Sequence, residues 1–319
     1  MSLATRKLAF VFPGQGSQKV GMVKAWADAS PEARATFEEA DEALGFPLSR
    51  LCWEGPEEEL NLTANTQPAL VAAAIAVLRA VAALAPELRP VAVAGHSLGE
   101  YSALVAAGAL DFADALRLVR RRGQLMQEAV PVGQGAMAAI IGLDPETIAG
   151  IASEAAIPGE VCAVANYNGP AQTVIAGDKV AIDRAVALAK ERGARKATLL
   201  AVSAPFHSPL MRPAREGMAP LLAATPFRDP RVPVVTNADA APVTTGEAAR
   251  DALVRQIDSP VRWVESVLRM ETGFGVQTFV EVGPGNVLSG LTRRIVQSAR
   301  TTAISDPDHL RQLLAEEEG

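Results

Sequence analysis

The chain has 319 residues, of which 49% are hydrophobic and 4% aromatic, and its net charge is −6. This length allows one large domain or two smaller ones, and the acidic balance, without a stripe of Lys and Arg, excludes a nucleic-acid partner. The longest apolar stretch, residues 69–84, is too short to cross a membrane and contains Arg79, and the N-terminus shows no secretory signal, so we expect a cytoplasmic protein that contacts no membrane.

The first 130 residues are predicted to form two strands and several helices. Serine followed by proline at 30–31 indicates a helix start, because serine caps a helix and proline suits its first turn. Asp111 is a similar N-cap. In chain order we predict a strand over 8–12, a helix from 30–31, a helix over 67–84, a strand ending at 95, and helices over 100–107 and 111–129.

Between residues 133 and 202 the pattern changes to shorter elements. The predicted order is strand 137–143, helix 145–156, strand 161–166, strand 172–176, helix 180–192 and strand 196–202. This β-α-β-β-α-β order is that of a ferredoxin-like unit, and its length suits a small subdomain. Gly133 and Gly135 at its start are suited to a hinge.

After residue 202 a longer alternation of helix and strand returns. We predict a strand over 232–236, a helix over 248–256, a strand over 278–282, a helix over 287–296 and a frayed tail at 316–319. The chain is therefore predicted to be an α/β protein with two domains. Residues 1–132 and 203–319 form a large domain with a parallel sheet, residues 133–202 form a small inserted domain, and a ligand cleft lies between them.

Residues 91–101, VAVAGHSLGEY, carry the strongest functional signal in the chain. A short apolar strand ends at Gly95 and a helix begins after Gly99, so Ser97 lies in a tight turn between two glycines. This Gly-x-Ser-x-Gly elbow puts the serine at a helix N-terminus, where free N–H groups and the helix dipole favour developing negative charge. We predict that Ser97 is a nucleophile, and the alternative is a simple turn bracketed by glycines.

Two glycine-rich turns suggest a nucleotide cofactor but lack its fingerprint. The turns at 14–16 and 283–285 each follow a strand, yet a lysine and a leucine stand where a third glycine is needed. We therefore interpret them as loops that approach a ligand closely. Gln15 and Gln18 would then be donors in the site, and plain turn residues are the alternative.

A nucleophilic serine needs a base, and the chain has three histidines. His96 adjoins Ser97, so its side chain should point away and have a structural or supporting role. His309 lies in a C-terminal helix, where we expect a solvated surface position. His207 stands in the loop 205–209, which has a proline at each end. We predict that His207 takes the proton from the Ser97 hydroxyl.

The helix that starts at Asp111 carries one charge on its apolar face. At ~100° per residue the apolar side chains of this segment share one arc, and Arg117, Arg120 and Arg121 lie opposite them. Arg122 lies within the apolar arc, and burying an unpaired guanidinium is costly, so it requires an anionic partner. That partner is either an internal Asp or Glu or the carboxylate of a substrate, which a guanidinium holds with two parallel hydrogen bonds.

Five of these features occur together in one known family. They are GHSLGEYS around Ser97, PGQGSQ at 13–18, the buried Arg122, the Pro-Phe-His207 loop and EVGPG at 281–285. In this order and spacing the chain resembles the malonyl-CoA:acyl-carrier-protein transacylases, the acyl-loading enzymes of fatty acid synthesis. The resemblance implies a large α/β-hydrolase-like domain with an inserted ferredoxin-like subdomain, in agreement with the partition predicted above.

The resemblance also implies roles for individual residues. Ser97 would accept the acyl group with His207 as its base. The backbone N–H groups of Gln15 and Leu98 would form the oxyanion hole. Arg122 would hold the free carboxylate of the malonyl group.

Supporting residues follow from the same resemblance. Gln256 matches a glutamine near the active site, and His207 is expected to lean on backbone carbonyls near residues 256 and 257. Asn166 and Asn168 match a segment of the small domain that lines the cleft.

The implied reaction moves malonyl from malonyl-CoA to the phosphopantetheine thiol of an acyl carrier protein through an O-malonyl serine. It requires no metal and no tightly bound cofactor. An acidic carrier needs a basic patch, for which Arg192, Arg195 and Lys196 are candidates, with ordinary solvated charge as the alternative. Phe206 would narrow the pocket and favour malonyl over methylmalonyl. The pathway of the carrier, fatty acid or polyketide, stays open.

Two other functions stay open at this point. A serine esterase or thioesterase shares the elbow, but it usually orients its histidine with an acid, here Asp258, and it needs no buried arginine. A non-catalytic module could bind acyl thioesters without turnover. We expect a monomer, because no segment shows an apolar surface stripe.

Overall fold

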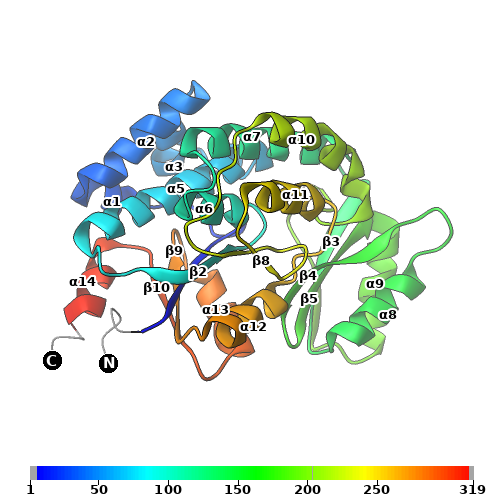
Figure 1. Ribbon diagram of the computed structural model, residues 1–319. Coiled ribbons are helices and arrows are strands. Elements are labelled where there is room, and N and C mark those ends of the chain that lie inside the picture. Colours follow the sequence, from blue (N-terminus) through cyan, green and yellow to red (C-terminus); the bar gives the residue numbers. More distant parts are fainter. Residues whose placement is uncertain (1–5, 203, 316–319) are drawn as a thin grey trace.

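The computed structural model describes residues 6–202 and 204–315, which form two sheets flanked by helices (Figure 1). In chain order the N-terminal part comprises β1 (Leu8–Phe12), α1 (Lys24–Ala29), α2 (Pro31–Leu44), α3 (Leu48–Glu54), α4 (Glu57–Leu60), α5 (Thr63–Leu84), β2 (Pro90–Gly95), α6 (Gly99–Ala106) and α7 (Phe112–Glu128). The middle part comprises β3 (Gly135–Ile141), α8 (Pro145–Ala155), β4 (Cys162–Gly169), β5 (Gln172–Asp178), α9 (Lys179–Glu191) and β6 (Lys196–Leu199).

The C-terminal part returns to the first sheet. It comprises the short 3₁₀ helix η2 (Pro209–Met211), α10 (Arg212–Ala224), β7 (Val234–Val235), β8 (Pro242–Val243), α11 (Gly246–Gln256), α12 (Trp263–Phe274), β9 (Thr278–Val282), α13 (Val287–Ile295), β10 (Arg300–Ile304) and α14 (Pro307–Ala315). The predicted tail at 316–319 lies outside the described residues.

The larger sheet has the strand order β10-β9-β1-β2-β7-β8, and its neighbouring strands are parallel except β7 and β8. Successive residues of β1 point to opposite faces, and both faces are buried. Phe10 and Phe12 join the core beneath α5 and α7, whereas Ala9 and Val11 pack with α12 and α13 on the other face. Figure 1 shows these two helical layers above and below the sheet.

The smaller sheet is antiparallel, with the strand order β4-β5-β3-β6, and α8 and α9 cover one of its faces. The predicted β-α-β-β-α-β order is therefore present between residues 135 and 199. Met137, Val174 and Ala176 on its other face belong to the core of the larger part of the molecule. This face is the one that meets the helices above the parallel sheet.

A backbone connection joins the smaller sheet to the larger part. The N–H of Tyr167 on β4 donates to the carbonyl of Val261 at 2.9 Å, and the N–H of Val261 donates to the carbonyl of Ala165 at 2.8 Å. Strand β4 is thereby held directly beside the segment that leads into α12.

Several elements differ from their predicted bounds. Helix α5 begins at Thr63 rather than near 67, so that Pro68 lies inside the helix, one turn after its start. Strand β6 ends at Leu199 rather than 202, and residues 200–202 turn towards the cleft. Helix α10 was not predicted, because Pro213 and Pro220 within it resemble loop signals.

The apolar stretch at 69–84, predicted from the sequence to be too short to cross a membrane, is part of α5, whose 22 residues are long and apolar enough to do so by length and composition alone. However, 72% of the most apolar window of this helix is buried inside the protein. Its buried residues pack against α2 and α7. This is the environment of a central core helix.

The turn after β2 depends on two glycines that leave no room for a side chain. A Cβ on Gly95 would lie 1.9 Å from the carbonyl carbon of Gly99, and a Cβ on Gly99 would lie 2.3 Å from the carbonyl oxygen of Phe12. The strand, the turn and α6 therefore pack backbone against backbone, as the spacing of the motif predicts.

Replacing Gly95 with alanine should lower the free energy of unfolding by about 4 kcal/mol or more, because rigid backbone must move. Gly290→Ala is the matched control: Gly290 lies exposed in α13, and a Cβ there meets no atom within 4 Å outside its own helix backbone. That variant should gain up to about 1 kcal/mol from helix propensity. Urea unfolding measures both changes, and a Gly95→Ala protein as stable as the wild type would contradict the packing described here.

Candidate active site

Ser97 occupies the turn between β2 and α6 in a left-handed backbone conformation, with φ at 53°. Asn237 stabilises this turn with two hydrogen bonds. Its Oδ1 accepts the N–H of Ser97 at 2.7 Å, and its Nδ2 donates to the carbonyl of Gly95 at 2.7 Å. A non-glycine residue in this conformation persists only where its surroundings impose it. The elbow predicted from the glycine spacing is therefore present, and its serine side chain is partly accessible.

His207 meets Ser97 in the way that proton transfer requires. The Nε2 atom lies 2.7 Å from Ser97 Oγ, while Nδ1 faces the carbonyls of Gln256 at 3.0 Å and Ser259 at 3.2 Å. Carbonyl oxygens only accept, so Nδ1 carries the proton and Nε2 is free to accept from the hydroxyl. Gln256 was an expected carbonyl partner, whereas the second one belongs to Ser259 and not to residue 257.

The imidazole is kept neutral by its surroundings. Burial, and secondly the positive charge of Arg122, lower the pKa of His207 to about 3. A neutral imidazole at physiological pH is ready to act as a base. Asp258, the acid that an esterase could have used, instead lies 3.3 Å from the guanidinium of Arg215.

The lowered pKa of His207 predicts the pH dependence of acylation. Because the base must be unprotonated, kcat/KM for acylation of Ser97 should stay nearly constant from pH 8 down to about 5, well below the ordinary histidine value of 6.5. The unfolded chain takes up this proton at the ordinary value, so protein stability should decrease as the pH falls below it. A rate profile measured with a parallel unfolding curve separates the two effects, and a half-loss of rate near pH 6.5 in folded protein would contradict the assignment.

Arg122 reaches the same serine from α7, and its side chain is buried. Its Nη1 donates to Gln67 Oε1 at 2.8 Å, and its Nη2 donates to Gln256 Oε1 at 2.9 Å and to Ser97 Oγ at 3.2 Å. Burial lowers the pKa of Arg122. Among the described residues no carboxylate forms an ion pair with it, and its Nε has no hydrogen-bond partner. The guanidinium thus donates its described hydrogen bonds only to neutral oxygens, and its carbon lies 5.9 Å from the centroid of the Tyr101 ring.

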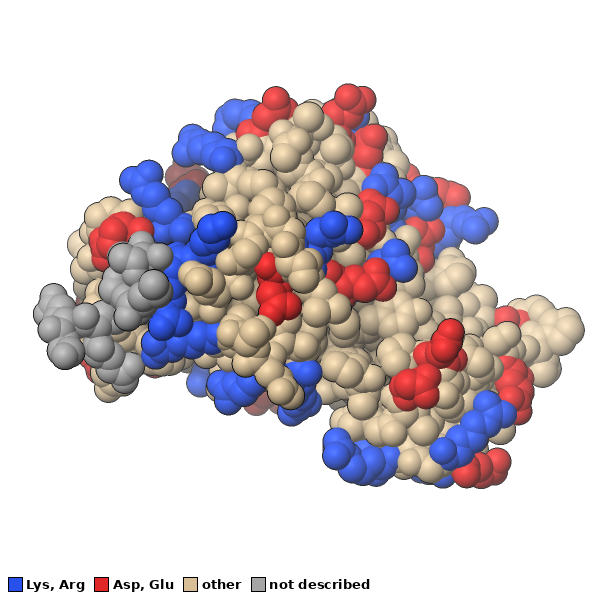
Figure 2. Space-filling model, turned by 60° about the horizontal axis from the view of Figure 1, so that its bottom comes forward, with Lys and Arg blue, Asp and Glu red and all other residues tan. Residues whose placement is uncertain are grey.

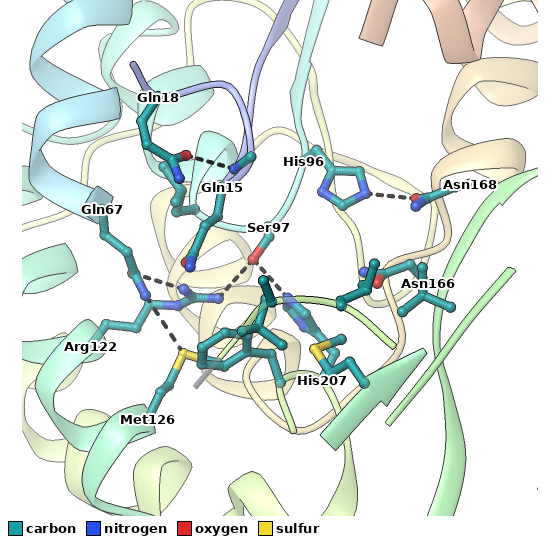
Figure 3. A pocket seen from close by; sticks show the side chains of 18 residues that line it. Gln15, Gln18, Gln67, His96, Ser97, Arg122, Met126, Asn166, Asn168 and His207 are labelled. Carbon is teal, nitrogen blue, oxygen red and sulfur yellow. Dashed lines mark hydrogen bonds between the residues drawn. The ribbon is translucent and has the colours of Figure 1, made fainter. Parts of the chain in front are cut away.

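These side chains surround a cavity of about 330 Å³ between the two sheets (Figure 3). Figure 3 shows Ser97 at its centre, with Arg122 and His207 on two sides of the hydroxyl. Its apolar wall comes from residues on α7, on the smaller sheet and in the loop before η2, namely Met126, Met137, Val174, Leu200, Val202 and Phe206. A small polar acyl group would fit beside a charged anchor here.

Gln15 and Leu98 line the cavity, and their backbone N–H groups donate to no other group in the described parts of the chain. The side-chain Nε2 of Gln15 donates to Thr63 Oγ1 at 3.4 Å. Gln18 also lines the cavity, but both ends of its amide are engaged, by the N–H of Gly16 at 2.7 Å and by Asn61 at 2.9 Å. Its side chain therefore braces the loop.

The remaining predicted residues lie on the side of the smaller sheet. His96 Nε2 lies 2.8 Å from Asn168 Oδ1, and its ring packs on Trp263 with the centroids 5.7 Å apart. Figure 3 shows His96 directed away from the Ser97–His207 pair, as expected for a supporting residue. Asn166 lines the cavity opposite Ser97 and forms the bridge to Val261.

Three contacts of the site were not anticipated from the sequence. Gln67 on α5, Asn237 after β7 and Glu100 on α6 are all buried and hydrogen-bonded to the groups named above. Gln67 closes the polar start of α5, TANTQ, just before the apolar run that begins after Pro68, so the helix pattern alone does not single it out. Burial raises the pKa of the Glu100 carboxyl to about 7, although the hydrogen bonds that it accepts from Gln256 and Asn237 act in the opposite direction and lower this pKa.

His309, on α14, lies outside the cavity, and its N–H donates to Asp306. Within residues 6–202 and 204–315, no three His, Cys, Asp or Glu side chains are placed to hold a metal ion. The chemistry that the described arrangement can perform is nucleophilic attack by a serine, assisted by a neutral histidine and next to a buried cation.

Comparison with known proteins gives a consistent result. Residues 9–308 match the family described as acyl transferase domain. The chain is 52% identical to the malonyl CoA-acyl carrier protein transacylase of Haemophilus influenzae, over 94% of this chain and 96% of that protein.

Solved structures agree as well. An acyl carrier protein S-malonyltransferase from Vibrio cholerae is 50% identical with a TM-score of 0.93, covering 96% of this chain and 99% of that one. A malonyl-transacylase in complex with a type II PKS acyl-carrier protein is 49% identical with a TM-score of 0.94, covering 97% and 99%.

Proposed function

The chain belongs to the acyl transferase family and, within it, to the malonyl CoA-acyl carrier protein transacylases, and from this premise we propose that Ser97 and His207 move a malonyl group from coenzyme A to an acyl carrier protein. The observation that carries the proposal is the contact of one hydroxyl with two groups, the neutral His207 at 2.7 Å and the buried Arg122 at 3.2 Å. The product would supply malonyl units for fatty acid synthesis.

The first half-reaction forms the acyl-enzyme. Ser97 Oγ attacks the thioester carbonyl of malonyl-CoA while its proton passes to His207 Nε2. The tetrahedral intermediate then collapses, the C–S bond breaks, and the imidazolium returns the proton to the leaving thiolate of coenzyme A. An O-malonyl ester of Ser97 remains.

The second half-reaction runs the same steps in reverse. The phosphopantetheine thiol of the carrier gives its proton to His207 and attacks the ester carbonyl. The C–O bond to Ser97 breaks, and the imidazolium reprotonates the serine. No metal or bound cofactor takes part in this scheme.

The negative charge of both intermediates forms on the former carbonyl oxygen. The free N–H groups of Gln15 and Leu98 border the cavity, and two donors of this kind form an oxyanion hole. Leu98 precedes the first turn of α6, whose dipole adds to the effect.

The free carboxylate of the malonyl group binds Arg122. The guanidinium has an unpartnered N–H and donates its other described hydrogen bonds to neutral oxygens, so a carboxylate gains charge-assisted hydrogen bonds there. Phe206, which is buried at the cavity wall, limits the space for a branched acyl group and favours malonyl over methylmalonyl.

The two sheets support a division into two domains. Residues 1–132 and 203–319 form an α/β-hydrolase-like domain around the parallel sheet, and residues 133–202 form a ferredoxin-like subdomain. The strand order β4-β5-β3-β6 with α8 and α9 on one face supports the second assignment. We further propose that the enzyme works as a monomer in the cytoplasm.

The carrier protein docks at the edge of the small domain. Of the three candidate cations there, Arg192 pairs with Glu154, while Arg195 and Lys196 are exposed. Figure 2 shows basic and acidic side chains interspersed over the end formed by α8 and α9. The electrostatic attraction of the acidic carrier protein to this end therefore depends on a few unpaired basic side chains.

Reversing both exposed charges, with Arg195→Glu and Lys196→Glu, should raise KM for the carrier about tenfold and reduce its dependence on salt. Acylation by malonyl-CoA provides the internal control and should change little. Charge reversal at Arg50, exposed on α3, is the matched variant. An unchanged KM for the carrier would remove these residues from the docking surface.

Intact-mass spectrometry tests the proposed function. Mixed with malonyl-CoA, the protein should gain the mass of one malonyl group and lose it when a phosphopantetheine-bearing carrier protein is added, with malonyl appearing on the carrier. Release of malonate to water without transfer would support the esterase alternative. A protein that never gains the mass would support the non-catalytic binding module.

A further inference from the structure

Glu100 is a buried acid next to the active site, and the mechanism above assigns it no role. It lies in the first turn of α6, three residues after Ser97, and its side chain is fully buried. A buried carboxylate is costly unless its hydrogen bonds compensate for lost hydration. A buried acid at this position, beside the nucleophile, is therefore expected to have a role in the site.

The hydrogen bonds of Glu100 converge on one of its oxygens. Oε2 accepts the backbone N–H of Asn237 at 2.8 Å and the Nε2 of Gln256 at 3.0 Å. Oε1 has no partner among the described residues. The carboxylate thus works as a single acceptor shared by one backbone donor and one side-chain amide.

This acceptor determines which way the amide of Gln256 faces. Nε2 donates to Glu100 and also to the carbonyl of Ser97 at 2.9 Å, so both neighbours on that side are acceptors. Oε1 is consequently turned to the other side, where it accepts from Arg122 at 2.9 Å. Reversing the amide would set oxygen against oxygen at one end and N–H against guanidinium at the other, which leaves several buried groups unpaired.

Glu100 is thereby linked to Arg122 through one amide, without touching it. A direct ion pair would compete with any carboxylate that Arg122 has to bind. With the amide in between, the guanidinium is held in place by the neutral oxygens of Gln256 and Gln67. Its charge stays available to a ligand.

We infer that Glu100 is a positioning residue for substrate selection: as a buried acceptor it orients Gln256, which in turn holds Arg122 towards the malonyl carboxylate. This role rests on the proposed function. It concerns a residue that contacts neither the acyl group nor the reacting atoms.

The test compares two substitutions at this position. In Glu100→Gln the new side-chain oxygen can take the place of Oε2 and keep both hydrogen bonds, while its NH₂ occupies the unpartnered position of Oε1. In Glu100→Leu the acceptor is lost, and the Asn237 N–H and Gln256 Nε2 lose a partner. Both variants are made alone and together with Arg122→Ala.

The readout is the ratio of kcat/KM for malonyl-CoA to that for acetyl-CoA in the acylation of Ser97. Acetyl lacks the second carboxylate, so a general loss of structure lowers both values alike, whereas misplacement of Arg122 lowers only the first. Glu281→Leu is the matched control, because Glu281 is equally buried and accepts the N–H groups of Leu288 and Ser289, away from Arg122. It should reduce stability and leave the ratio unchanged.

We expect the ratio to fall about tenfold in Glu100→Leu, to stay within about threefold of the wild type in Glu100→Gln, and to show no further fall when Glu100→Leu is added to Arg122→Ala. An unchanged ratio in Glu100→Leu, an equal fall in Glu100→Gln, or an additive effect in the double variant would each overturn the inference. A wild-type protein that gains no malonyl mass would instead refute the proposed function, so the two failures are distinguishable.

Discussion

Ser97→Ala should abolish the malonyl adduct and reduce malonyl transfer to the carrier by a factor on the order of 10⁴ or more. In the proposed mechanism the Ser97 hydroxyl is the group that becomes acylated, and it lies 2.7 Å from His207 Nε2, the base that would activate it. When a nucleophile and its base act together, removing one of them reduces the rate nearly as much as removing both. The residual rate comes from binding alone.

Intact-mass spectrometry and transfer kinetics check this prediction. Ser102→Ala is the matched control, since Ser102 is a buried serine of α6, the helix that follows the Ser97 turn, and its hydroxyl has no partner among the described residues. It should retain acylation. A malonyl mass that persists in Ser97→Ala would assign the nucleophile to another residue.

Arg122→Ala should reduce the preference for malonyl-CoA over neutral acyl thioesters more than it reduces the rate at which Ser97 is acylated by a neutral thioester. Truncating one partner of a buried, hydrogen-bonded charge pair costs about 2–5 kcal/mol, which corresponds to a fall in kcat/KM for malonyl-CoA of about 30-fold to 5,000-fold. Neutral acyl thioesters do not use the guanidinium, and the vacated space should let them react better than in the wild type. The preference for malonyl over acetyl should therefore disappear.

Acylation rates with malonyl-CoA and acetyl-CoA measure this effect. Arg121→Ala on the same helix provides the control, because Arg121 faces solvent and lies 3.5 Å from the carboxylate of Glu128. Its removal should leave the preference intact. If Arg122→Ala also kept its malonyl preference, the carboxylate would have to bind elsewhere.

The parts of the site that could be predicted from the sequence are the local ones. The elbow around Ser97 is determined by residues within five positions of each other, since the glycines must let strand and helix touch. The burial of Arg122 follows from helical periodicity alone. His207 could be chosen because only three histidines are available and one lies in a rigid loop.

The partners of these residues could not be predicted in the same way. Arg122 is held by Gln67, 55 positions away, and by Gln256, 134 positions away. Such contacts arise from packing between α5, α7 and α11. Hydrophobic periodicity predicts which face of each helix is buried, but it does not predict which other helix packs against that face. The same limit applies to the internal acid considered as a partner for Arg122: among the described residues no carboxylate pairs with it, and Glu100 is linked to it only through the amide of Gln256.

Two elements that pack on or extend the larger sheet, α12 and β10, were not predicted from the sequence. Helix α12 was not predicted, although Trp263, Val267 and Met270 are spaced as on one helical face and are all buried against the larger sheet. Strand β10 is a five-residue edge strand that continues the parallel sheet. Both elements depend on a sheet whose position is known only once the chain has folded.

In the proposed mechanism, the two carbonyls that orient His207 would affect how long the acyl-enzyme survives. A histidine beside a carboxylate gains basicity from a full negative charge, whereas the carbonyls of Gln256 and Ser259 offer only dipoles. A weak base deprotonates a thiol, with a pKa of about 8.5, far more readily than water, at about 15.7. On the proposed mechanism the O-malonyl ester of Ser97 would react with a thiol in preference to water, so that the malonyl group would be retained until the carrier protein binds.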